Sequence, residues 1–593
     1  MKKSILFILA VVLTFSSCDD LFTPADQNFK DPEQMYDDTG FAQGFLMHTY
    51  RMIPAYYNNT EYATDDAVTN QKGNNFLNMA TGTWTASNNP MNMWELYGAI
   101  QQLNMFLSHV ENVNWALDEE ASVLFGMRMK GEAHGLRALF MYYLVRNHSG
   151  FAEDGSLLGV PILTEFQDVN SDYNQPRDKF EDCIQQIYRD LDEAERLLPM
   201  EFENITSNEQ IPATYRSITS RYTIYNRVMG EYSRGLFNAL AAKSFRSRVS
   251  LLAASPAFQD ASNTTTWANA ANSAASVLNY VGGVSGLDPN GIAFYEKAMV
   301  DQATEGRNPK EIIWRENLTA VSNDNTNSIT QELNNFPPSL FGSGQMNPSQ
   351  NLVDAFPMAN GYPISDQSNS GYNAANPYAN RDPRLATYII YNGNTAGTGN
   401  SQILTGSQAG NDGINSTLET ATRTGHYMKK RLRMDVNCNS SSYSKQPHYT
   451  PRIRYTEIFL NYAEAANEAW GPTGNGGNAY SAYDVIKAIR TRAKVGTSNG
   501  DPYLEGCKLD QNKMRELIRT ERRLELCFES FRFWDLRRWK SNLNEPVRGS
   551  DASNAYSIFD VETRAYESYM NYGPIPHSEI LKFNNLIQNR GWR

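Results

Sequence analysis

One stretch near the C-terminus gathers enough charged residues to suggest catalysis. The segment 521–539 carries four carboxylates among several arginines: Glu521, Glu525, Glu529 and Asp535. Two paired carboxylates can hydrolyse a glycosidic bond. Residues three or four apart on a helix also form ion pairs, such as Glu529 with Arg532, and arginine forks hold neighbouring segments together. Because acidic and basic residues balance locally, we interpret this stretch as structural and predict no catalytic residues.

Other patterns of nucleophiles and metal ligands are weaker. The segment 496–500 reads G-x-S-x-G, but that motif needs a preceding strand and a following helix. Here it follows a helical run, and we interpret it as a loop. The cysteines after Cys18 lack zinc spacing, and Cys183 and Cys527 lie in helical apolar patterns where Cys packs as a small hydrophobe. Loops rich in Asp and Asn permit calcium without ligand spacing that requires it, so we expect no metal and no cofactor.

Several residues in polar segments have the chemistry that sugar binding needs. Aromatic rings pack against the apolar faces of sugars, while amides and carboxylates bond the hydroxyls. The segment 56–92 supplies most of the candidates: Tyr56, Tyr57, Asn58, Asp65, Asn74 and Trp84. Trp84 lacks an apolar stripe around it, so its ring is either exposed to ligand or folded back as a buried anchor. Trp267 is a further candidate.

The elements that must position these loops are helices. From Met129 to Tyr143, apolar residues recur at intervals of four and three, which places them on one helix face. Gly131 and Gly135 would let a neighbouring segment approach closely, because packing must offset their low helix propensity. A second helix begins near Asp178, since Asp178 and Glu181 have the spacing of a capping box.

Further helical patterns alternate with long polar segments. The helical patterns cover 94–110, 236–254, 457–469, 484–493 and 513–524. Several come in pairs, as in helix-turn-helix repeats, although no fixed period emerges. The polar segments are 56–92, 320–350, 357–381 and 392–423. Because loops of this length are usually functional when ordered, the sequence predicts a mostly α-helical scaffold with large loop insertions that carry the binding site.

The N-terminus resembles the signal of an exported lipoprotein. Lys2 and Lys3 precede an apolar run, 5–15, that is too short to span a bilayer. The following Ser16, Ser17 and Cys18 resemble a lipobox. We therefore predict a signal peptide at 1–17, lipidation of Cys18 and a tether at 18–40, with acyl chains as the anchor. An ordinary secreted protein with an incidental cysteine is the alternative.

The charge of the chain excludes one class of partner. The formal net charge is −12, and removal of the signal with its two lysines makes it −14. A net-acidic chain without basic runs is a poor nucleic-acid binder and gains nothing from an anionic membrane. We expect no nucleic-acid partner, and membrane attachment through the lipid alone.

Short motifs in a fixed order resemble the SusD/RagB family over nearly the whole mature chain. The matching segments are 94–104, 132–143, 159–161, 190–199, 241–253, 382–385, 454–465 and 574–592. The most specific one is 521–539, which reads ERRLELCFESFRFWDLRRW. The resemblance implies one SusD-like domain over 41–593. Tetratricopeptide-like helix pairs would lie in roughly 41–260 and the family's C-terminal part in roughly 290–593.

The resemblance also implies a function. Such a protein is a lipid-anchored protein of the outer-membrane surface that binds an oligosaccharide and delivers it to a SusC-like TonB-dependent transporter, without being an enzyme. Three alternatives remain open from the sequence. In the first, the same architecture binds a peptide in place of the glycan. In the second, the chain is a surface glycosidase that uses carboxylates of 521–529. In the third, it is a helical scaffold that binds only protein.

Overall fold

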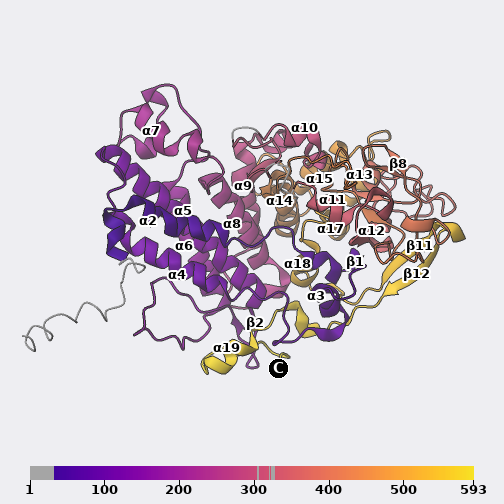
Figure 1. The fold of residues 1–593 in the computed structure, drawn as a ribbon, viewed down its shortest axis with the longest axis horizontal. Helices are drawn as coiled ribbons and strands as arrows, with labels where there is room; N and C mark the ends of the chain where they lie inside the picture. The colour runs from indigo at the N-terminus through magenta and orange to yellow at the C-terminus, as the bar shows by residue number, and fades with distance from the viewer. Residues whose placement is uncertain (1–31, 304–305, 320, 322–327) are drawn as a thin grey trace, which may run out of the picture.

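The computed structural model describes residues 32–303, 306–319, 321 and 328–593. The predicted signal peptide and Cys18 lie outside these residues, so cleavage and lipidation stay predictions. Within the described ranges, no helix combines the length and apolar character needed to cross a bilayer. Figure 1 shows long helices on one side of the molecule and loops with short strands on the other, which agrees with the mostly helical class predicted from the sequence.

The long helices form a packed array in chain order. They are α2 (Thr39–Arg51), α4 (Leu96–His109), α5 (Glu119–His148), α6 (Phe180–Leu197), α8 (Ala239–Ala254) and α9 (Trp267–Tyr280). Each helix packs against the next, and α9 packs against α14 (Tyr455–Trp470). Helices α15 (Ala482–Arg492) and α17 (Gln511–Glu525) then pack on α14. One hydrophobic core therefore runs from the N-terminal helices into the C-terminal half.

The remaining elements are short. The other helices are α3 (Asn75–Asn78), α7 (Tyr222–Met229), α10 (Lys297–Val300), α11 (Thr330–Asn335), α12 (Gln350–Ala355), α13 (Pro383–Tyr388), α16 (Pro502–Cys507), α18 (Arg532–Arg538) and α19 (His577–Lys582). The antiparallel strand pairs are β1 (Ala67–Thr69) with β5 (Met346–Pro348), β2 (Gly150–Phe151) with β3 (Leu157–Leu158), β4 (Ile312–Arg315) with β10 (Pro451–Arg454), β6 (Ile389–Ile390) with β9 (Tyr427–Met428), β7 (Thr395–Ala396) with β8 (Ser401–Gln402), and β11 (Val547–Asp551) with β12 (Ser557–Glu562). The pairs β1–β5, β4–β10 and β6–β9 join segments that are distant in the sequence, and the other three are hairpins.

The glycines of α5 have the role that the sequence predicted. A Cβ added to Gly135 would lie 2.2 Å from the ring of Phe237, and one added to Gly131 would lie 2.7 Å from Leu198. Real Cβ atoms do not approach other atoms so closely, so both positions need glycine for the neighbouring segments to pack. Cys183 and Cys527 are buried, as predicted.

Helix α6 begins close to Asp178, as predicted, but the predicted capping box is wrong. The helix begins at Phe180 after Lys179, with no side-chain cap. The Asp178 carboxylate instead accepts a hydrogen bond from the backbone N–H of Ile162 at 2.7 Å. A tertiary contact with the preceding loop has replaced the local one that the spacing suggested.

Candidate ligand-binding site

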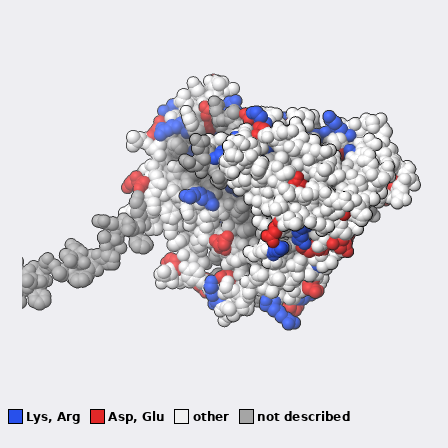
Figure 2. All heavy atoms as spheres, turned by 45° about the vertical axis from the view of Figure 1, so that its right-hand side comes forward, with Lys and Arg blue, Asp and Glu red and all other residues white. Residues whose placement is uncertain are grey.

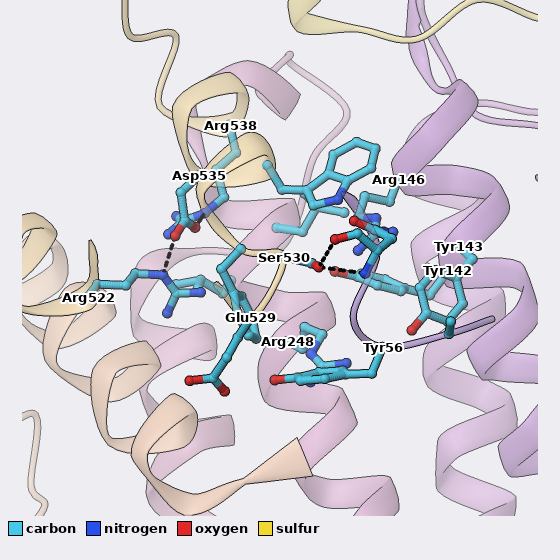
Figure 3. A pocket seen from close by; sticks show the side chains of 16 residues that line it. Tyr56, Tyr142, Tyr143, Arg146, Arg248, Arg522, Glu529, Ser530, Asp535 and Arg538 are labelled. Atoms are coloured by element: carbon cyan, nitrogen blue, oxygen red, sulfur yellow. Dashed lines mark hydrogen bonds and ion pairs between the residues drawn. The ribbon is translucent and has the colours of Figure 1, made fainter. Parts of the chain in front are cut away.

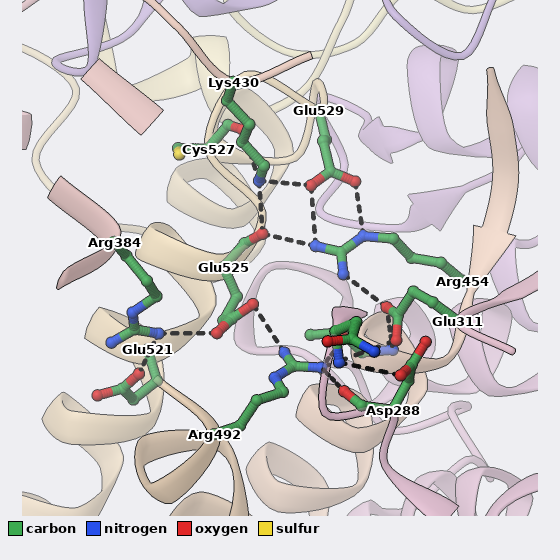
Figure 4. Close-up of polar contacts among 12 residues, drawn as sticks. Asp288, Glu311, Arg384, Lys430, Arg454, Arg492, Glu521, Glu525, Cys527 and Glu529 are labelled. Atoms are coloured by element: carbon green, nitrogen blue, oxygen red, sulfur yellow. Dashed lines mark hydrogen bonds and ion pairs between the residues drawn. The ribbon is translucent and has the colours of Figure 1, made fainter. Parts of the chain in front are cut away.

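The carboxylates of 521–529 are buried in ion pairs. Arg384 places one guanidinium nitrogen 2.8 Å from Glu521 and 2.8 Å from Glu525, and Arg492 approaches Glu525 at 2.9 Å (Figure 4). Neither glutamate is exposed to solvent. Burial alone would raise the pKa of Glu525, but the positive charges of Arg492 and Arg384 outweigh it and lower the pKa to about 2. Glu525 is therefore ionised at neutral pH and holds no proton for general-acid catalysis.

Glu529 belongs to the same cluster, and the predicted pair with Arg532 is wrong. Its carboxylate accepts from Lys430 at 2.7 Å and from Arg454 at 2.8 Å. Arg532 instead makes two hydrogen bonds to Asp65, at 2.9 and 2.8 Å. We call Arg384, Lys430, Arg454, Arg492, Glu311, Glu521, Glu525 and Glu529 the buried ion-pair network. Its partners come from distant segments, so it joins the C-terminal loops to α17, as the structural interpretation expected.

Trp84 is folded back into the protein, which is one of the two alternatives left by the sequence. Its ring is 4% exposed and packs edge-on against Trp592 at 4.9 Å. The indole N–H donates to Asn89 Oδ1 at 2.9 Å. A buried ring with a satisfied N–H offers no open face for a sugar in this conformation.

The other predicted residues from this loop are also occupied by the fold. Asp65 is buried, and its pKa lies well below the usual range, because Arg523 and Arg532 outweigh the effect of burial. Asn58 and Asn74 accept hydrogen bonds from the backbone N–H groups of the short helices that they cap. These three side chains hold the loop in shape.

Tyr56, Tyr57 and Trp267 do not line a common cavity. The rings of Tyr56 and Tyr57 are 5.1 Å apart, yet they line different cavities. The guanidinium carbon of Arg431 lies over the Tyr57 ring, 3.5 Å from the ring centroid. Trp267 is the first residue of α9 and packs half-buried against the main core. The structure therefore does not bring the predicted candidates together into one site.

A different set of loop residues surrounds an open pocket of about 620 Å³. Its walls come from the end of β1, from the segment 414–423 and from β12. The lining residues are Thr69, Asn70, Lys72, Leu77, Ile414, Asn415, Ser416, Thr417, Leu418, Glu419, Ala421, Thr422, Arg423, Phe559, Asp560 and Val561. We call this the loop pocket. Pockets of this size take small molecules, and the lining mixes hydroxyl and amide side chains with apolar ones.

Arg423 ties the three walls of the loop pocket together. One of its guanidinium N–H groups donates to the carbonyl of Thr69 at 2.9 Å and pairs with Glu562 at 3.0 Å. Its backbone N–H donates to Asn347 Oδ1, also at 3.0 Å. Asn347 belongs to β5, the partner of β1. The walls are thus held by bonds that leave the pocket surface itself free for ligand.

Among the residues that the structure describes, Phe559 is the one aromatic residue that lines the loop pocket. In the β11–β12 hairpin it lies opposite Gly549. A Cβ on Gly549 would lie 2.6 Å from the Phe559 ring, so the ring rests on the glycine backbone. A half-buried ring supported from behind is a rigid platform of the kind that packs against a sugar.

The charges around the loop pocket balance. Lys72 and Glu419 form a 3.0 Å ion pair at the rim, with side chains 86% and 82% exposed. Arg423 and Asp560 supply one further charge of each sign. Figure 2 shows the same character on the loop-rich side, where the surface is mostly uncharged and Lys, Arg, Asp and Glu are intermixed. The pocket therefore suits an uncharged polar ligand.

The loop pocket is lined mainly by segments that the sequence indicated as loops, but not by the residues that the sequence singled out. The segments 56–92 and 392–423 were both predicted as candidate loops, and both contribute walls. Phe559 was not singled out, because its partner Gly549 and the hairpin that pairs them have no strong sequence signal. The alternation of apolar Phe559 and Val561 with charged Asp560 and Glu562 offered only a weak one.

Two sequence-family models match the chain. One is described as the SusD family and covers residues 310–592, and the other as starch-binding associating with outer membrane and covers 35–223. Among curated proteins, SusD-like protein P2 of Formosa agariphila is 31% identical over 142 residues, which are 24% of this chain and 25% of that protein. The match thus spans about a quarter of that relative.

Solved structures share the fold over nearly the full length. A SusD-like protein from Bacteroides fragilis NCTC 9343 superposes with a TM-score of 0.68 at 21% identity, covering 96% of this chain and 100% of that one. A SusD-like carbohydrate binding protein from the same strain gives a TM-score of 0.67 at 22% identity, covering 93% and 99%. At this identity the likeness concerns the fold alone.

Proposed function

We propose that this chain, which belongs to the SusD/RagB family, binds a neutral oligosaccharide. The binding would take place in the loop pocket, at the outer-membrane surface. In this proposal Cys18 carries the lipid anchor, and a SusC-like TonB-dependent transporter receives the captured glycan. The family-model description that names starch binding and the outer membrane supports the location and the ligand class.

The observation that carries the proposal is the combination found in the loop pocket. A supported aromatic ring, Phe559, lines the same open pocket as the hydroxyl and amide side chains of 415–417. Sugars need both surfaces, since their C–H faces are apolar and their hydroxyls need partners. An open pocket also admits the ends of a longer chain, so we expect binding to an internal stretch of an oligosaccharide.

The proposed role is binding without catalysis. Glu521, Glu525 and Glu529 are buried within ion pairs, so a sugar could reach them only if the core opened. A glycosidase needs one carboxyl group that keeps its proton near neutral pH. Glu525 does not meet this requirement, because its low pKa means that it has lost its proton near neutral pH. The absence of a metal or cofactor requirement stays part of the proposal.

Calorimetric titration tests the ligand class. The mature chain without its lipid is titrated with neutral polysaccharides, their oligosaccharides, acidic polysaccharides and peptides. Saturable heat with neutral glycans, unchanged glycan products after long incubation and no heat with peptides are expected. Binding to peptides alone would replace the cargo while leaving the fold assignment intact. Release of reducing sugar would contradict the binding role.

A further inference from the structure

A small cavity and a larger groove border the helical array. The small cavity contains Tyr56 and has a volume of about 50 Å³ (Figure 3). The charged groups on its 522–538 wall are paired with one another, since Arg522 and Arg538 both bond Asp535. Ligand pockets usually enclose about 300 Å³ or more, so this cavity admits water-sized species and no sugar.

The larger space is a groove on three neighbouring helices. Helix α8 packs against both α6 and α9 and lies between them (Figure 1). Residues of these three helices and of the segment 264–265 line the groove, which has a volume of about 450 Å³. We call it the helix groove. It shares no lining residue with the loop pocket, so a ligand in it would occupy a separate site.

The charges at the helix groove cancel. The carboxylate of Glu195 lies 2.9 Å from Lys243 Nζ and 2.8 Å from Arg246 Nε. Arg246 also pairs with Asp192 at 2.6 Å. Two cations therefore meet two carboxylates, and no surplus charge remains to attract a phosphate, a carboxylate ligand or a nucleic acid.

The α9 wall of the helix groove carries uncharged side chains that form hydrogen bonds. Asn269, Asn272, Ser273 and Ser276 line the groove, and their spacing places them on one helix face. Helix α9 contains no charged residue. Asn and Ser are weaker helix formers than the Glu, Lys and Arg that usually cover exposed helix faces, so this face costs some helix stability. Its polarity suits a neutral ligand that forms hydrogen bonds.

Several polar atoms in the helix groove have capacity left for such a ligand. Asn272 Oδ1 accepts from Asn478 at 3.2 Å, and Asn269 Oδ1 takes part in the capping box of α9. Neither side-chain NH2 group donates to another of the described residues. Gln185 donates through its amide nitrogen to two neighbouring side chains, which leaves its carbonyl oxygen as an acceptor. Sugar hydroxyls both donate and accept, so they match this mixture.

An aromatic ring also lines the helix groove. Tyr188 is half-buried, its hydroxyl lies 3.2 Å from Thr265 Oγ1, and the Arg246 guanidinium lies 5.4 Å from the ring centroid. Such a fixed ring can pack against the apolar face of a sugar. Among the described residues that line the groove, none is a large apolar side chain exposed to solvent. Because protein interfaces bury an apolar centre, the lining favours a sugar over a protein partner.

We propose that the helix groove is a second binding site for neutral oligosaccharides, separate from the loop pocket. Asn269, Asn272 and Gln185 would hold the sugar hydroxyls, and Tyr188 would contact a sugar ring. The inference rests on the proposed function for its ligand class and not for its location. A polysaccharide long enough to reach both sites would bind more tightly than to either alone, because the second contact is then intramolecular.

Calorimetry with Phe559→Ala, which weakens the loop pocket, isolates the helix groove. The probes are maltoheptaose, cellohexaose, laminarihexaose, mannohexaose and xylohexaose, titrated into the mature chain without its lipid. We expect the wild type to bind at least one probe at two sites per chain, and Phe559→Ala to keep one of them with unchanged Kd. No saturable heat with any probe in Phe559→Ala would overturn the proposal.

Ser276→Trp fills the helix groove from α9 without removing a packed side chain, because Ser276 is exposed. In the Phe559→Ala background it should abolish the saturable heat, and alone it should leave only the loop pocket. The matched control is Ser108→Trp on α4. Both serines are exposed, and both hydroxyls donate to the carbonyl three residues earlier at 2.8 Å. The control should bind at two sites, like the wild type.

The two sites fail in different ways. If Ser276→Trp and Ser108→Trp bind alike and Phe559→Ala does not bind, the helix groove is refuted and the loop pocket stands. If Ser276→Trp abolishes all binding and Phe559→Ala binds like the wild type, the loop pocket is refuted and the helix groove stands. If Ser276→Trp does not fold, Asn272→Ala in the Phe559→Ala background decides. It should weaken binding about threefold to tenfold, and unchanged affinity would refute the helix groove.

Discussion

The loop pocket and the buried ion-pair network both contain polar residues, but in the network these residues bond one another, whereas in the pocket they border an open space. In the network, arginines and glutamates from distant segments bond one another and leave nothing exposed. In the loop pocket, one arginine, Arg423, holds the walls, and hydroxyl, amide and apolar side chains line an open space. A dense group of charges thus marks where this fold is held together, and a sparse polar surface marks where it can bind.

The same contrast separates two buried glutamates. The carboxylate of Glu525 lies between Arg384 and Arg492 and has a pKa of about 2. Glu61 is equally buried, but its carboxylate accepts mainly from the backbone N–H of Ser530, and burial raises its pKa to about 7. For these two carboxylates, the direction of the pKa shift depends on whether the nearby positive charges outweigh the effect of burial.

The largest expected effect is the loss of a charge from the network. Glu525→Gln leaves Arg384 and Arg492 facing a neutral group, and breaking a buried pair in this way costs about 3–5 kcal/mol of unfolding free energy. Urea unfolding at pH 7 measures it. The control Glu516→Gln lies on the same helix with a side chain 70% exposed and should change the free energy by less than about 0.5 kcal/mol. Equal losses in both variants would contradict the distinction.

Glu61 should produce an effect that depends on pH in the opposite sense to Glu525. Its folded-state pKa is raised from 4.5 to about 7, so the proton it holds stabilises the fold below pH 4.5, and that contribution is lost as pH rises through 7. Glu61→Gln resembles the protonated form. Relative to the wild type, it should gain stability on the order of 3 kcal/mol between pH 4 and pH 8. A constant difference across this range would show that Glu61 is ionised throughout.

The lowered pKa of Glu525 predicts the reverse trend at acid pH. Its contribution to stability is present above pH 4.5 and is lost as pH falls towards 2. The difference between the wild type and Glu525→Gln should therefore shrink over that window. Unfolding midpoints in urea, measured from pH 5 down to the onset of acid unfolding, provide the comparison. A difference that stays constant would contradict the ion-pair account.

A smaller free-energy change, confined to binding, is expected in the loop pocket. Phe559→Ala should weaken affinity for the best glycan by about 10- to 100-fold, as loss of an aromatic anchor does. Its Tm should change little, because the ring lies on the surface of a hairpin. The control Tyr232→Ala removes an aromatic ring that is 91% exposed on the helical side. Parallel losses of affinity in the two variants would move the site away from the loop pocket.

The smallest effect belongs to the rim of the loop pocket. The pair between Lys72 and Glu419 is almost fully exposed, so Lys72→Met should cost less than about 1 kcal/mol and even less at high salt. Thermal unfolding at two salt concentrations measures this. A loss as large as that of Glu525→Gln would mean that the rim, and not the network, holds the loops.

The sequence predicted most of the long helices but did not predict α2 and α9. The stripe from Met129 to Tyr143 identified α5, whereas α9 buries small residues such as Ala270, Ala271 and Ala274 and gave no comparable pattern. Trp267 looked like a loop residue for the same reason. Helix periodicity is visible only when the buried face differs strongly from the exposed one.

The candidate site was predictable only in outline. Long polar segments indicated where loops would lie, but the loop pocket depends on contacts between 69–72, 414–423 and β12 that no local pattern encodes. Trp84 and Asp65 had suitable chemistry, yet the fold uses them internally. Residue type alone does not distinguish a ligand contact from a tertiary one, since both satisfy the same groups.

A crystal structure of the mature protein with the oligosaccharide that binds best in calorimetry tests the central claim most directly. We predict sugar density in the loop pocket, with a ring packed against Phe559 and hydroxyls bonded to side chains of 415–417. Density at another surface, with the loop pocket filled only by water, would contradict the account and leave the family assignment and the buried ion-pair network unchanged.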